Sequence, residues 1–93
     1  MFVGILTVEL HVFDSGSLKS KRSVVKGMKD RIRSRFNVSV AEVDNQDLWQ
    51  RATLGVACVS GDKSHAVDVL NKVMDLVRSN TSAELIDYSI EVI

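Results

Sequence analysis

Hydrophobic residues recur with two different periods along this chain, and the order of these periods restricts the topology. The periodicity of apolar residues predicts four strands, over residues 2–13, 37–44, 51–60 and 83–93. Between them, residues 18–35 and a segment that ends near Asn80 carry apolar side chains at helical spacing. The order strand, helix, strand, strand, helix, strand predicts one ferredoxin-like α+β domain of residues 1–93. In this βαββαβ sandwich a four-stranded antiparallel sheet carries two helices on one face.

Several local signals refine this prediction. Ser17 precedes the first helix and is expected to be its N-cap. The alternation slips in the second strand, which predicts a β-bulge near Val40 and Ala41. In the last strand, one face is expected to carry Ile86, Tyr88, Ile90 and Val92.

Positive charge is concentrated in the first helix, although the net charge of the chain is zero. Residues 17–36 contain eight of the twelve Lys and Arg residues and one acid, Asp30. At about 100° per residue, five of these cations form a stripe ~21 Å long beside the apolar seam. We call this set the basic stripe: Lys19, Arg22, Lys26, Lys29 and Arg33. Lys21, Arg31 and Arg35 flank the seam on its other side.

Two interpretations of the basic helix remain open. A solvated helix face normally interleaves acids with its cations, and here Lys26–Asp30 is the only such pair within the helix. Repulsion between the cations, and their place near the positive end of the helix dipole, oppose helix formation by about 1–2 kcal/mol. Carboxylates of neighbouring strands are one source of compensation, and an anionic partner is the other.

The second interpretation leads to a nucleic-acid site. The residues expected to contact phosphates are Lys19, Lys21, Arg22, Lys26, Lys29 and Arg33. The turn Ser15–Gly16–Ser17, at the helix start, offers backbone N–H groups to an anion. RNA, and ribosomal RNA in particular, fits a stripe of this length better than a single nucleotide does.

A protein-interaction module, or a homodimer, is the alternative. The face of the sheet without helices carries apolar residues among acidic ones, and either this face or an exposed strand edge could join a partner. The candidate contacts are Ile5, Trp49 and Val59. Trp49 lies in the loop between the second and third strands, where it either caps the core or anchors a partner. Base stacking on this face is not expected, because the face is acidic and offers no aromatic platform.

The residues offer no catalytic constellation, metal site or cofactor site. Cys58 is expected to face the core from the third strand, where packing is commoner than catalysis. His11 and His65 are far apart in sequence and have no second ligand nearby. A single cysteine suits a reducing compartment, the N-terminal segment reads as a strand, and no apolar run approaches membrane-spanning length. We therefore expect a cytoplasmic, non-enzymatic protein.

Three stretches together, "SLKSKR", "FNVSVAEV" and "WQRATLG", occur in an order that resembles the small bacterial YlxP-like proteins, a family of unknown function. The similarity covers nearly the whole chain. It implies a ferredoxin-like fold and, in many bacteria, a gene position beside factors for transcription termination, translation initiation and ribosome maturation. It implies no catalytic residues.

Overall fold

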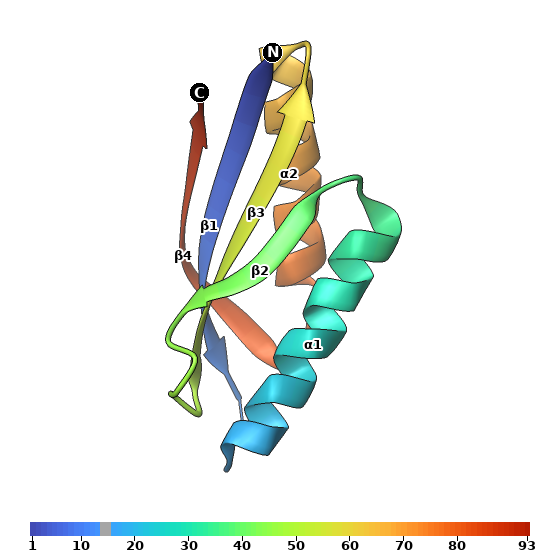
Figure 1. Ribbon diagram of the computed structural model, residues 1–93. Coiled ribbons are helices and arrows are strands. Elements are labelled where there is room, and N and C mark those ends of the chain that lie inside the picture. Colours follow the sequence, from blue (N-terminus) through green and yellow to red (C-terminus); the bar gives the residue numbers. More distant parts are fainter. Residues whose placement is uncertain (14–15) are drawn as a thin grey trace.

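The computed structural model describes residues 1–13 and 16–93, and its elements follow the predicted order (Figure 1). The elements are β1 (Phe2–Val12), α1 (Leu18–Arg35), β2 (Ser39–Asp44), β3 (Arg51–Ser60), α2 (Lys63–Arg78) and β4 (Ala83–Val92). The strands form one antiparallel sheet in the order β2-β3-β1-β4. This order is the ferredoxin-like topology, so the predicted fold is confirmed.

Side-chain caps start both helices. The Ser17 hydroxyl accepts a hydrogen bond from the Ser20 N–H at 3.1 Å, which confirms Ser17 as the N-cap of α1. The Asp62 carboxylate accepts one from the Ser64 N–H at 2.9 Å and begins α2. At the other end of α1, Phe36 adopts an extended backbone conformation, and the chain continues into β2.

The core lies between the sheet and the helices. Alternate residues of β1 and β3 point into it and are almost completely buried: Leu6, Val8, Leu10, Val12, Leu54, Val56 and Cys58. The two helices cover them with buried apolar side chains: Val25, Met28, Ile32, Ala66, Leu70, Val73, Met74, Leu76 and Val77. Complete burial of one Val, Leu or Ile side chain contributes about 1.5–3 kcal/mol, so this layer supplies most of the folding free energy. Cys58 is buried and unpaired, as expected for a core cysteine.

The absence of a side chain at Gly4 lets α2 lie close to β1. A Cβ atom at Gly4 would lie 2.9 Å from Leu70 Cδ1 and 3.4 Å from Ala66 Cβ. Both neighbours are completely buried and have little room to move.

The structure moves the bulge predicted in β2 and shows a second irregularity in β4. The break in the β2–β3 register falls between Glu42 and Asp44, so Val43 is the extra residue, a little after the predicted bulge at Val40–Ala41. A second irregularity, in β4, was not predicted: Leu10 pairs with Leu85 and Glu9 with Asp87.

This second irregularity leaves Ile86 as the extra residue in β4. Ile86 is 46% exposed, and Leu85 packs against the core instead. The predicted face of β4 is therefore wrong at Ile86. A bulge shifts the alternation of side chains by one residue, which moves Ile86 out of the core-facing set.

Candidate nucleic-acid interface

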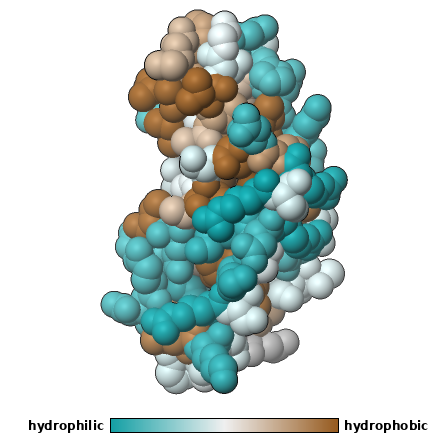
Figure 2. All heavy atoms as spheres, turned by 45° about the vertical axis from the view of Figure 1, so that its right-hand side comes forward, coloured by the Kyte–Doolittle hydropathy of each residue, from teal (hydrophilic) through white to brown (hydrophobic). Residues whose placement is uncertain are grey.

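The basic stripe lies on the solvent side of α1. Lys19, Arg22, Lys26 and Arg33 are exposed, and Lys29 is half-buried. Figure 2 brings this side of the molecule forward, and hydrophilic side chains cover most of its lower and middle part. The helix spacing therefore places these five cations as the sequence predicted, along one flank of a single helix.

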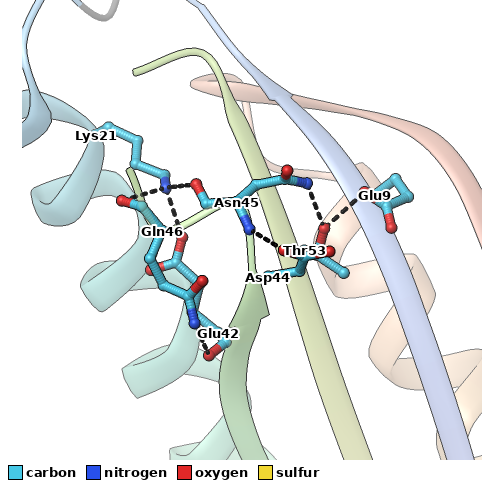
Figure 3. A network of polar contacts seen from close by, with 7 residues as sticks. All are labelled: Glu9, Lys21, Glu42, Asp44, Asn45, Gln46 and Thr53. Carbon is cyan, nitrogen blue, oxygen red and sulfur yellow. Dashed lines mark hydrogen bonds and ion pairs between the residues drawn. The ribbon is translucent and has the colours of Figure 1, made fainter. Parts of the chain in front are cut away.

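Lys21 does not belong to this surface. Its side chain is completely buried, and its ammonium lies 2.5 Å from the Glu42 carboxylate. It also donates to the backbone carbonyls of Asn45 at 2.8 Å and Gln46 at 3.4 Å (Figure 3). All three donor positions of the ammonium are thereby occupied, so Lys21 is not free to contact a phosphate.

Lys21 fixes the β2–β3 loop against α1. The amide of Asn45 continues the contacts by donating to the Thr53 hydroxyl at 2.8 Å, and that hydroxyl donates to the Glu9 carboxylate at 2.7 Å (Figure 3). Asn45 also turns the chain with a φ of 61°, in the left-handed region that Asn tolerates better than most residues. The network therefore joins α1, the loop, β3 and β1.

The burial of Lys21 could have been predicted from its position in the sequence relative to the buried residues of α1. Lys21 lies four residues before Val25, on the same helical face as Met28 and Ile32. A lysine in line with a buried seam needs a buried acceptor. Glu42, in the strand next to α1, supplies it.

Asp30 neutralises part of the basic stripe. Lys26 donates to the Asp30 carboxylate at 2.8 Å, and Arg33 Nη1 lies 3.7 Å from the same carboxylate. The hydrogen bond from Lys26 lowers the pKa of Asp30, and the positive charges of Lys26, Arg33 and Lys29 act in the same direction.

Arg33 also makes a contact with the sheet. Its Nη2 donates to the backbone carbonyl of Val40 at 2.9 Å. Val40 belongs to β2, which is an edge strand, so the guanidinium satisfies one carbonyl of that strand.

The other five cations of α1 have no ion-pair partner in the described part of the chain. Among the described residues, no carboxylate lies within ion-pair distance of Lys19, Arg22, Lys29, Arg31 or Arg35. Among the described strands, a single carboxylate, that of Glu42, neutralises a cation of α1, and that cation is Lys21.

The predicted anion-binding turn is only partly described. Ser15 lies outside the described residues. Gly16 is exposed, and the Ser17 hydroxyl is engaged with the Ser20 N–H and lies 3.3 Å from the Ser20 hydroxyl.

The face of the sheet without helices has an apolar half and an acidic half. Val59 is 67% exposed, and it pairs with Val3, whose backbone bonds with Ile93 in both directions at 2.9 Å. Nearby, a shallow apolar groove of about 380 Å³ is lined by residues of three strands: Ile5, Ser39, Val40, Ala41, Val43, Gly55, Val56 and Ala57. The acidic half contains Glu9, where Arg51 lies 3.8 Å from the carboxylate, and Asp87 opposite it on β4.

Trp49 does not cap the core. The residue is 53% exposed, and Leu48 beside it is 48% exposed. Of the two roles that the sequence left open for Trp49, burial at the end of the core is therefore wrong.

Metal-binding clusters and membrane-spanning helices are both absent from the described residues. Within the described part of the chain, no group of three or more His, Cys, Asp and Glu side chains is placed to hold a metal ion. No described helix is both long and apolar enough to span a membrane.

The fold and this surface define a small ferredoxin-like α+β domain with one strongly basic helix. Residues 3–90 match the model of a family described as protein of unknown function (DUF503), and the chain belongs to this family. It is 38% identical over 77 residues to the uncharacterized protein YlxP of Bacillus subtilis (strain 168), covering 83% of this chain and 84% of that protein. The family resemblance of the sequence is thereby confirmed.

Two solved structures resemble the chain in fold at much lower sequence identity. A de novo designed protein with a ferredoxin fold aligns with a TM-score of 0.49 and 10% identity, over 100% of this chain and 84% of the design. A REP-associated tyrosine transposase bound to a REP hairpin aligns with a TM-score of 0.44 and 14% identity, over 98% of this chain and 55% of the transposase. Neither likeness bears on function at this level of similarity.

Proposed function

We propose that this protein is a cytoplasmic, non-enzymatic RNA-binding protein that associates with the ribosome through α1. The observation that supports the proposal is the charge left on this helix. Of its eight cations only Lys21 is completely buried, and Asp30 is the only acid on the helix.

The electrostatics of α1 favour an anionic partner. Lys19 and Arg22 lie in the first turns of α1, where the helix dipole disfavours positive charge, and the first turn contains no acid. Neither cation has a carboxylate at ion-pair distance among residues 1–13 and 16–93. Phosphates that contact these side chains would offset the unfavourable local field and release counterions.

The shape of the stripe favours a polymer over a small ligand. The stripe is about 21 Å long, because its first and last members are fourteen residues apart at about 1.5 Å per residue. Such a line can follow several successive phosphates of an RNA backbone. Contacts of this kind position a protein without reading sequence, so little base specificity is expected from the stripe itself.

The test of this proposal is co-sedimentation with ribosomes. The variant Lys19→Glu/Arg22→Glu reverses two cations of the stripe that form no ion pair with any described residue. The matched control, Lys63→Glu/Lys72→Glu, makes the same charge change on exposed positions of α2.

The wild-type protein and the control are expected to sediment with ribosomes, and Lys19→Glu/Arg22→Glu is expected to stay in the supernatant. Crosslinking in cells, followed by sequencing of bound RNA, should recover more ribosomal RNA with the wild type than with Lys19→Glu/Arg22→Glu. Equal sedimentation of all three proteins would contradict the proposal.

A second candidate function is association with a second copy of the chain through the apolar half of the open sheet face. The observation that favours it is an apolar row made by Val59 of β3, Val3 of β1 and Ile93, which follows β4 directly. Val59 and Ile93 are 67% and 69% exposed. Light scattering should then give a dimer whose mass falls to that of a monomer in Val59→Asp. A monomer at every concentration of the wild type would exclude this candidate.

A further inference from the structure

Trp49 is exposed on a loop that the structure holds beside the start of α1. Trp49 is 53% exposed, which leaves a large apolar and aromatic surface in water, whereas tryptophan residues are usually mostly buried. Leu48, Gln50 and Arg51 line a shallow hollow with it. The exposed ring is therefore available to a ligand.

The loop that carries Trp49 is tied down at its base. The Leu48 N–H donates to the Asn45 carbonyl at 3.1 Å, and the ammonium of Lys21 donates to the same carbonyl at 2.8 Å. The Asn45 side chain is in turn bonded to Thr53 of β3 (Figure 3). The base of the loop is thus fixed both to α1 and to the sheet.

This anchoring places an aromatic residue near the N-terminal end of the basic stripe. Lys21, which holds the loop, lies between Lys19 and Arg22 in the first turns of α1. The exposed cations and the exposed indole therefore come from different elements and lie at the same end of the molecule. Stacking of bases on aromatic side chains, beside cations that contact the backbone, is how single-stranded nucleic acids are commonly bound.

We propose that Trp49 stacks on an unpaired base of a single-stranded RNA segment whose phosphates contact Lys19 and Arg22. This inference rests on the proposed function and names its ligand class, single-stranded rather than duplex RNA. A duplex keeps its base faces stacked inside and offers none to an indole. The strand follows α1 and avoids the open sheet face, because Glu9 and Asp87 on that face repel phosphate.

The experiment uses Trp49 as its own probe, because it is the only tryptophan in the chain. The full-length protein is titrated with single-stranded oligoadenylate of about twelve nucleotides, a length within the usual site size of such proteins. The same strand paired with its oligouridylate complement is the duplex control. Fluorescence of Trp49 reports stacking, and anisotropy of a dye on the RNA reports binding independently.

Binding of the single strand is expected to change the Trp49 fluorescence, and binding of the duplex is not. Trp49→Ala should weaken single-strand binding by about 5- to 150-fold, the range of one lost base–aromatic stack. Its affinity for the duplex should not change, and Trp49→Phe should restore most of the single-strand affinity. A cooperative urea unfolding transition of each variant shows that the fold is retained.

The outcomes separate this inference from the proposed function. If Lys19→Glu/Arg22→Glu abolishes binding but Trp49→Ala binds the single strand as the wild type does, the stacking inference is wrong and the proposed function stands. An unchanged Trp49 signal at saturation would also overturn the inference. If the wild type binds neither RNA nor, in the sedimentation test, ribosomes, both proposals fail.

Discussion

The ammonium of Lys21 and the carboxylate of Glu42 lie 2.5 Å apart, and this ion pair fastens α1 to β2. Lys21 is completely buried, and the Glu42 side chain is 14% exposed. A buried pair costs desolvation of both groups, so its removal as a unit affects stability far less than the loss of one partner.

We therefore expect Lys21→Met to lower the free energy of unfolding by about 3 kcal/mol, because it leaves Glu42 beside an apolar side chain without its counterion. The double variant Lys21→Met/Glu42→Leu should recover at least half of this loss. Urea unfolding of Lys21→Met, Glu42→Leu and the double variant measures the coupling as a double-mutant cycle. Additive losses would show that the pair does not act as a unit.

Arg33 and Arg22 are both members of the basic stripe, but only Arg33 holds the sheet. Arg33→Ala removes the hydrogen bond to the Val40 carbonyl and is expected to lower the free energy of unfolding by about 1–2 kcal/mol. Arg22→Ala, at an exposed position without an ion pair among the described residues, should stay within about 0.5 kcal/mol of the wild type. Equal stability of the two variants would argue against the Val40 contact.

The pKa of Asp30 is lowered chiefly by the hydrogen bond from Lys26. Because the folded-state pKa of Asp30 is below its ordinary value, its pair with Lys26 stabilises the fold fully at a pH above that ordinary pKa. This contribution is lost as the pH falls through the lowered pKa. In Lys26→Met the pKa of Asp30 should move up toward its ordinary value, as measured by NMR titration of the carboxyl carbon. A pKa of Asp30 that does not respond to Lys26→Met would contradict the assigned cause.

Asp30 is also expected to restrain RNA binding, because it neutralises part of the stripe. Asp30→Asn frees Lys26 and relieves Arg33 of its nearby carboxylate, so the affinity for RNA should rise. The slope of log affinity against log salt should steepen by up to about 0.7–0.9, the value of one additional phosphate contact. Asp68→Asn, on the exposed side of α2, is the control with the same charge change. Equal affinities of the two variants would mean that net charge alone matters.

Periodicity was enough to predict the topology of this chain, because each strand and helix carries its own apolar repeat. It failed where one residue departs from a regular ladder. Val43 and Ile86 are the extra residues of two bulges, and the position of a bulge depends on pairing with another strand, which a local pattern does not contain.

The charges of α1 were also only partly predictable. The angular positions of Lys19 and Arg22 follow from helix geometry, so their exposure could be anticipated. The burial of Lys21 depends on Glu42 and on two carbonyls of the β2–β3 loop, which are more than twenty residues away in the chain. The exposure of Trp49 likewise depends on how that loop is held, and its composition alone was compatible with both roles.

The salt dependence of RNA binding tests the central claim most directly. Affinity for a labelled ribosomal RNA fragment is measured between about 50 and 200 mM salt for the wild type, Lys19→Glu/Arg22→Glu and Lys63→Glu/Lys72→Glu. Four phosphate contacts, those of the stripe apart from Lys26, which Asp30 holds, predict a logarithmic slope of about −2.8 to −3.6 for the wild type and the α2 control. The slope should be shallower by about 1.4 to 1.8 for the α1 variant. An affinity that does not depend on salt, or equal slopes for the three proteins, would contradict binding of RNA through α1.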